Sequence, residues 1–232
     1  MADYYTLVPA LPALAPLHKL QELPCSTLKL EQRLGMLSEP DRAQLECALR
    51  LCQRERLGDE ALSDADEVQQ WQRELAQIAD PALRVLVSDY LESRTLVAAL
   101  RYRQAGQQSG AEFQGFGERL WLIRRNWQQP LFGLEGQFPW LVRAREALES
   151  GQARTLELLL LERFWERLRR FEQVQMFSFA AVAAYRLRWA LAEYRLRWDG
   201  EQAQQSFDQW VVGVLAGMEA DTETRQWTGS EA

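Results

Sequence analysis

Catalysis needs a base, a nucleophile or a set of metal ligands, and this chain offers few residues for those roles. His18 is the only histidine, and it lies in a proline-rich stretch, so we do not expect a Ser-His-Asp triad, a Cys-His pair or a histidine metal site. Cys25, Cys47 and Cys52 form an odd set without Cys-x-x-Cys spacing. That set favours neither a disulfide framework nor zinc and fits a reducing compartment.

Paired carboxylates and phosphate-binding loops are equally poor candidates. Glu162 and Glu166 are one helical turn apart, as in di-metal helical bundles, but those sites also need a Glu-x-x-His companion that this sequence lacks. The glycines form neither a Walker nor a dinucleotide-binding pattern. We therefore expect no enzymatic activity, no cofactor and no metal.

Arginines form the most suggestive polar pattern. Arg163, Arg167 and Arg170 fall on one helix face at spacings of four and three, and Arg188 and Arg195 lie two turns apart on the next helix. These cations could bind an acidic partner protein, where charge sets orientation and encounter rate. The alternative is a solvated face that forms salt bridges with the chain's own glutamates.

Arg101 and Arg103 flank Tyr102 near the end of another predicted helix. Such arginine and aromatic neighbours could bind RNA, or they could extend the surface for a protein partner. The formal net charge of -6 repels nucleic acid phosphates and anionic lipid headgroups. We therefore favour a protein partner and expect no nucleic acid.

Proline and amphipathic repeats predict the elements that must position these residues. Pro9, Pro12, Pro16 and Pro24 predict an extended arm over residues 1–24 that packs on the helices, with a short strand over 4–8 as the alternative. Helix starts, stops and apolar repeats predict helices over about 38–56, 64–78, 80–106, 116–130, 138–148, 156–171, 179–198 and 201–218.

Four of these helices have recognisable starts or faces. Ser38 is predicted to begin the helix over 38–56, Asp64 or Asp66 the next, and Asp80 the third. Ser178 is predicted to cap the helix over 179–198, with Gly200 closing it. The buried seam of that last helix is predicted to contain Val182, Tyr185, Trp189, Ala192 and Leu196.

The sequence thus predicts an all-α protein with a single helical domain of about seven to eight antiparallel-packed helices and an extended N-terminal arm. We expect the domain over 25–218, with possible sub-lobes 25–110 and 111–218, and a disordered acidic tail over 219–232. The longest apolar run, Leu158 to Leu161, is too short to cross a bilayer, and no basic export signal begins the chain. We expect a cytoplasmic protein.

Three blocks of sequence resemble a bacterial family associated with V-type (V/A-type) rotary ATPases, whose members stand in for the stalk subunit that is called C, or d in eukaryotes. Residues 4–12 are similar to its initial Tyr-Tyr-x-Leu-Val-Ala-x-Leu-Pro pattern, with departures at Pro9 and Ala10. Residues 124–140 resemble its central block, and residues 158–189 its C-terminal block. The residues that carry the resemblance are Tyr4, Tyr5, Leu11, Pro12, Asn126, Pro130, Phe132, Gly133, Phe138, Pro139, Trp140, Tyr185 and Trp189.

The resemblance implies a non-catalytic central-stalk or accessory subunit that links the soluble ATPase head and shaft to the membrane rotor ring. It implies other ATPase subunits as partners, with membrane contact only indirect through the ring, and a cytoplasmic position peripheral to the inner membrane. A stand-alone helical adaptor, which binds an acidic protein through the arginine faces, is the alternative. The resemblance assigns no catalytic residue.

Overall fold

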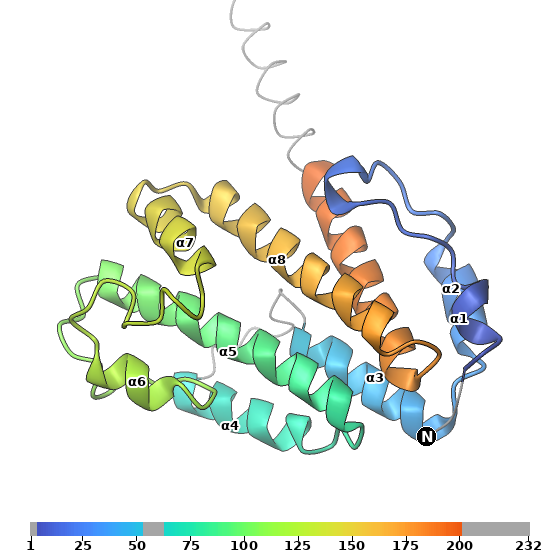
Figure 1. Cartoon of the computed structure of the whole chain (residues 1–232), viewed down its shortest axis with the longest axis horizontal. Helices are drawn as coiled ribbons and strands as arrows, with labels where there is room; N and C mark the ends of the chain where they lie inside the picture. Colours follow the sequence, from blue (N-terminus) through green and yellow to red (C-terminus); the bar gives the residue numbers. More distant parts are fainter. Residues whose placement is uncertain (1–3, 53–62, 201–232) are drawn as a thin grey trace, which may run out of the picture.

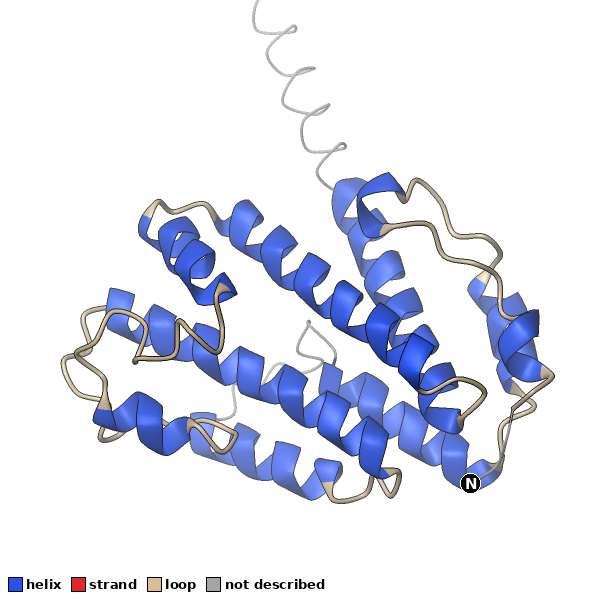
Figure 2. Cartoon of the chain, viewed as in Figure 1, coloured by secondary structure: helices blue, strands red, loops and turns tan. Residues whose placement is uncertain are grey.

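The computed structural model of this chain describes residues 4–52 and 63–200. Within these two ranges the regular structure is helical and contains no strand (Figure 2). This finding confirms the predicted all-α fold class.

The N-terminal segment is less extended than predicted. It contains a single-turn helix, α1 (Leu7–Ala10), and a 3-10 turn, η1 (Leu17–Lys19). Pro9 fits into α1 because the first turn of a helix needs no amide hydrogen bond from that position. The possible strand over 4–8 is therefore wrong, whereas buried Leu7, Leu17 and Leu20 show that the segment packs on the core.

Short polar side chains begin most of the helices in the first half. The elements here are α2 (Thr27–Leu34), α3 (Glu39–Cys52), α4 (Asp64–Leu75) and α5 (Pro81–Gln104). The Ser38 hydroxyl accepts from the Asp41 amide, and the Asp80 carboxylate accepts from the Leu83 amide, as predicted. Ser63, one residue before the predicted candidates, caps α4. The predicted end of α3 near residue 56 lies outside the described residues.

The second half contains α6 (Leu120–Arg125), α7 (Trp140–Glu149), α8 (Ala153–Val174) and a helix over residues 179–200. Helix α6 is much shorter than the predicted 116–130, in part because Gly117 adopts a φ of +109°, which no helix tolerates. Ser178 caps the last helix through the Ala181 amide, as predicted. Gly200 is still helical. The predicted helix over 201–218 and the tail over 219–232 lie outside the described residues.

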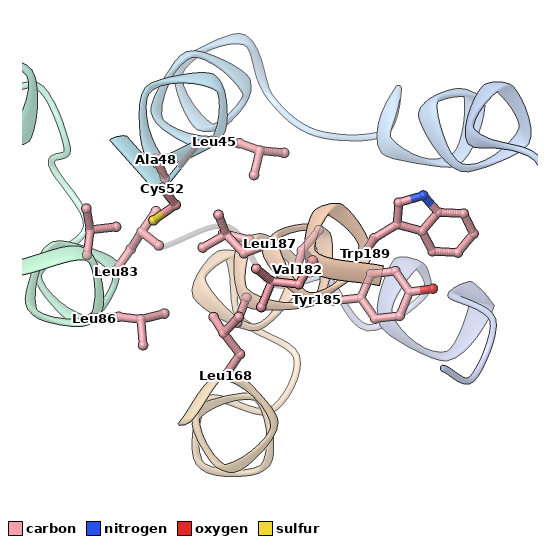
Figure 3. Close-up of a cluster of buried hydrophobic side chains, with 14 of the residues drawn as sticks. Leu45, Ala48, Cys52, Leu83, Leu86, Leu168, Val182, Tyr185, Leu187 and Trp189 are labelled. Atoms are coloured by element: carbon pink, nitrogen blue, oxygen red, sulfur yellow. The ribbon is translucent and has the colours of Figure 1, made fainter. Parts of the chain in front are cut away.

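Two hydrophobic clusters form the core, and α5 and α8 contribute to both. Figure 1 shows α3, α4 and α5 on one side of the molecule, with α8 and helix 179–200 on the other. The first cluster includes Leu7 and Leu30 together with Leu45, Leu83, Leu168, Val182 and Trp189, which Figure 3 shows. The second includes Leu96, Ile123, Phe132, Leu141 and Leu156. These clusters do not follow the sequence division into 25–110 and 111–218.

In the parts of the chain that the structure describes, none of the helices combines the length and the apolar character needed to cross a bilayer.

Candidate protein-interaction surfaces

Two of the predicted surface arginines hold α8 to α5. The Arg163 guanidinium donates to the Ser93 hydroxyl at 2.9 Å, and the Arg167 guanidinium donates to the Asp89 carboxylate at 2.5 Å. Between them the Tyr90 and Phe164 rings lie with their centroids 4.4 Å apart. We call this set of contacts the α5–α8 seam.

Arg163 lies deeper in the seam than Arg167. Its guanidinium lies 4.6 Å from the centroid of the Trp140 ring, an arrangement that favours the cation where water is excluded. Burial lowers the pKa of Arg163, and the Asp89 carboxylate partly opposes this shift. Arg163 is thus a structural contact between helices, whereas Arg167 remains exposed at the edge of the seam.

Two cavities of about 440 and 330 Å³ flank the seam, and Tyr90, Arg163 and Phe164 line both. Several polar groups on the wall of the larger cavity already bond to one another. Arg94 pairs with Glu67 at 3.4 Å, and the Tyr102 hydroxyl donates to Asp64. These polar contacts hold α4 to α5 along the wall of the cavity.

Arg188 contradicts the prediction of an exposed cationic face on helix 179–200. Only 7% of the residue is exposed, its guanidinium donates to the Glu172 carboxylate at 2.8 Å, and it stacks 4.7 Å from the Trp165 ring centroid. A partner protein cannot reach a cation in this position. Arg188 is a buried link between α8 and the last helix.

Burial raises the pKa of Glu172 to about 7, and the Arg188 guanidinium opposes this shift. Glu172 therefore binds a proton more tightly in the folded chain than in the unfolded one. This contribution to stability is complete below about pH 4.5 and is lost as the pH rises through about 7.

We expect the free energy of unfolding to fall by roughly 3 kcal/mol between pH 4.5 and 7 because of Glu172. Replacing Glu172 with Gln should flatten the decline, as measured by urea unfolding at successive pH values. An identical pH dependence in both proteins would contradict the assignment.

Two further arginines from the predicted set make contacts within the chain. Arg103 donates to the carbonyl oxygens of Gln129 and Pro130, at 2.5 and 2.8 Å. Arg195 pairs with Asp199, one turn further along its helix. Burial lowers the pKa of both guanidinium groups. Neither cation is free to receive a partner's carboxylate.

Arg101 and Arg170 are the members of the predicted set that remain exposed without an ion pair or side-chain hydrogen bond to another described residue. Arg101 lies at the mouth of the larger cavity. Arg170 lies one turn before the end of α8. The predicted arginine face is therefore reduced to a few separate cations.

Residues from the first and third resemblance blocks meet in space. The Tyr185 hydroxyl donates to the Pro12 carbonyl at 2.7 Å, and Leu11 packs against the same cluster that contains buried Trp189. Tyr4 donates its hydroxyl hydrogen to Asp41 at 2.5 Å and accepts from the Ser38 amide at 3.2 Å. These residues join the N-terminal segment to α3 and to helix 179–200.

The central block forms a tight loop between α6 and α7. The Asn126 amide donates to the Phe132 carbonyl at 3.1 Å, and the Pro130 carbonyl accepts from Arg103. Phe132 is buried with a φ of +57°, and Gly133 follows with a φ of +69°. The block continues at the start of α7, where the Phe138 and Trp140 rings make an edge contact and Pro139 precedes the helix.

Gly133 is the position in this loop least tolerant of a side chain. A Cβ atom there would lie 2.8 Å from the Gln129 side-chain oxygen, on a backbone that L-residues rarely adopt. We expect Gly133→Ala to lower the free energy of unfolding by about 1 to 2 kcal/mol. Gly136→Ala is the matched control, because open space surrounds that position. Equal midpoints of chemical unfolding for the two variants would contradict this reading of the loop.

Sequence reasoning missed an exposed apolar surface between α8 and helix 179–200. Val174, Met176 and Tyr5 are 78%, 67% and 62% exposed, and Phe177 packs beside Tyr5 with ring centroids 5.2 Å apart. We call these four residues the apolar tip. A signal was present, because the residues after Val174 are Gln, Met and Phe where a turn usually contains glycine, asparagine or serine.

Comparisons with known protein families, curated proteins and solved structures give no match for this chain. Among the described residues, no three histidine, cysteine, aspartate or glutamate side chains gather as a metal site would require.

Proposed function

We propose that this chain is a non-catalytic central-stalk or accessory subunit of a bacterial V/A-type rotary ATPase, similar in role to the stalk subunit that is called C, or d in eukaryotes. In this proposal it links the soluble head and shaft to the membrane rotor ring. Its partners are other ATPase subunits, and it contacts the membrane only through the ring. It then acts in the cytoplasm, peripheral to the inner membrane.

The observation that carries the proposal is the contact between the first and third resemblance blocks. The Tyr185 hydroxyl reaches the Pro12 carbonyl across 173 residues of sequence, and Tyr4 ties the same segment to α3. Residues that carry the resemblance therefore also hold the helices together. A body that transmits torque must resist deformation, and such long-range contacts support that use.

The exposed apolar tip supports a binding role independently of the resemblance. Large side chains left in water at one end of a helical body are typical of surfaces that another protein covers. Catalysis would instead require converging acid, base or nucleophilic groups.

Affinity purification of the tagged chain from its native cells tests the proposal. We expect the catalytic and shaft subunits of the ATPase to be recovered with it in fixed ratio, and recovery to survive salt that disrupts surface ion pairs. Cells that express the tag alone provide the background. Recovery of the folded chain without any ATPase subunit would contradict the proposal.

Arg101 and Arg170 are exposed and form no ion pair with another described residue, which favours a second candidate, a stand-alone adaptor for an acidic protein. Under that hypothesis one acidic partner is recovered, and the ATPase subunits are not.

A further inference from the structure

The apolar tip is built from parts of the chain far apart in sequence. Val174 ends α8, Met176 and Phe177 form the turn that follows, and Tyr5 comes from the start of the chain. Figure 1 shows this turn at the same end of the molecule as α1. The contact between Tyr5 and Phe177 therefore brings the start of the chain beside the turn that follows α8.

Hydrogen bonds to backbone carbonyls fix the shape of the tip. The Tyr4 amide donates to the Phe177 carbonyl at 2.7 Å, and the Ser178 hydroxyl donates to the Gln175 carbonyl at 2.6 Å. Phe177 has a φ of +61°, which is unfavourable for a bulky residue and persists only where its surroundings enforce it. Binding a partner would then require little ordering of these residues, which reduces the entropic cost of association.

The charges beside the tip indicate what kind of surface fits it. Arg170 lies one helical turn before Val174, so the two residues share a face of α8, and Arg170 is exposed without an ion pair to another described residue. The carboxylates nearby bond to other arginines, because Glu166 pairs with Arg169 and Glu172 pairs with Arg188. Glu166 attracts Arg170 only at longer range and more weakly than it attracts Arg169. Arg170 therefore has no ion-paired carboxylate among the described residues, and a complementary surface can supply one.

We propose that the apolar tip docks into an apolar pocket on a partner protein, with an Asp or Glu of that protein accepting hydrogen bonds from Arg170. The partner's identity as an ATPase subunit rests on the function proposed above, whereas the surface and its chemistry do not. Arginine and large hydrophobic side chains in such a pair are the usual centre of binding energy at an interface.

Two other occupants fit the tip less well. A second copy of this chain would bring another Arg170, and the acids next to its tip are already paired. An anionic membrane would meet only a small number of cations here, on a chain of formal net charge -6, and single weak anchors bind membranes poorly. The experiment below distinguishes both of them from a partner protein, because a second copy and a lipid give different crosslinked products.

Site-specific photocrosslinking in the native cell tests the proposal. The photoreactive residue p-benzoylphenylalanine replaces Met176, and the control places it at Leu28, which is similarly exposed on α2. We expect position 176 to crosslink to one protein, at a peptide that contains apolar residues and a carboxylate, and position 28 to give no such product. Circular dichroism verifies that both proteins are folded.

Charge reversal makes the test specific. Arg170→Glu should reduce the crosslink from position 176 about tenfold, and changing the partner's mapped carboxylate to Arg should restore it. Crosslinks to lipid, to a second copy of this chain, or at no more than the level of position 28 would overturn the proposal. So would a mapped crosslink that Arg170→Glu leaves unchanged.

The two proposals can fail separately. If position 176 crosslinks specifically to a protein that is not an ATPase subunit, the docking surface stands and the rotary ATPase assignment fails. If the chain is recovered with the ATPase but position 176 gives no product above the control, the assignment stands and the docking surface fails.

Discussion

Replacing Trp189 with Ala is expected to lower the free energy of unfolding by about 3 to 5 kcal/mol. The side chain is fully buried in the larger hydrophobic cluster, beside Tyr185 (Figure 3). Its indole nitrogen donates to the Glu193 carboxylate at 3.1 Å, and the same carboxylate accepts from the Thr27 hydroxyl. Removal therefore opens a cavity and also weakens a polar contact between α2 and the last helix.

Chemical unfolding followed by circular dichroism measures this effect. Trp121→Ala is the matched control, because Trp121 is 61% exposed on α6, and its loss should change stability by less than about 0.5 kcal/mol. Similar losses for the two variants would show that helix 179–200 does not pack as described.

Replacing Arg188 with Ala is expected to destabilise the chain by about 3 to 5 kcal/mol at pH 8. The change leaves the Glu172 carboxylate largely buried without its cation and removes the guanidinium stacked on Trp165. At pH 5 the penalty should be smaller. Protonated Glu172 is neutral there, so the loss of its counterion matters less.

The Arg169 and Glu166 pair provides the control, since both side chains are largely exposed. Arg169→Ala should cost less than about 1 kcal/mol at either pH. The double variant Arg188→Met with Glu172→Leu should recover much of the lost stability, because a pair of apolar residues leaves no unpaired buried charge. An Arg188→Ala penalty as small as that of Arg169→Ala would mean that Arg188 lies at the surface after all.

Local sequence signals predicted where several helices begin and which face the last one buries. Asp80 followed by Pro81 supplies a capping carboxylate and a suitable first residue, so the start of α5 depends on neighbours in sequence alone. The buried seam of helix 179–200 was predicted in the same way, from residues at helical spacing, although its last member, Leu196, is only partly buried. Helix α6 was overestimated because apolar spacing continues through residues whose backbone follows tight turns instead.

Which arginines are buried or paired within the chain could not be predicted from their spacing. Arg163 and Arg167 share a helix face with Arg170, yet their partners Ser93 and Asp89 lie on α5, 70 and 78 residues away. Helical periodicity places a side chain on a face but does not say which other element covers that face. Arg188 shows the same limit, because its burial follows from Glu172 and Trp165 on α8.

The positive φ values of two phenylalanines also could not be predicted from the neighbouring sequence. Phe132 and Phe177 adopt positive φ values that sequence reasoning reserves for glycine or asparagine. A side-chain hydrogen bond from Asn126, six residues earlier, holds Phe132, and a long-range backbone hydrogen bond from Tyr4 holds Phe177. Both phenylalanines lie in blocks that carry the resemblance, which connects those blocks to the shape of the fold.

The proposed role in a rotary ATPase is tested most directly by electron cryomicroscopy of the enzyme, purified through a tag on one of the catalytic polypeptides and not on this chain. We expect density for this all-helical body between the shaft and the membrane ring, with the apolar tip buried against a neighbouring protein of the complex. An intact, active ATPase whose stalk contains no density for this chain, and no peptide of it by mass spectrometry, would contradict the proposed role.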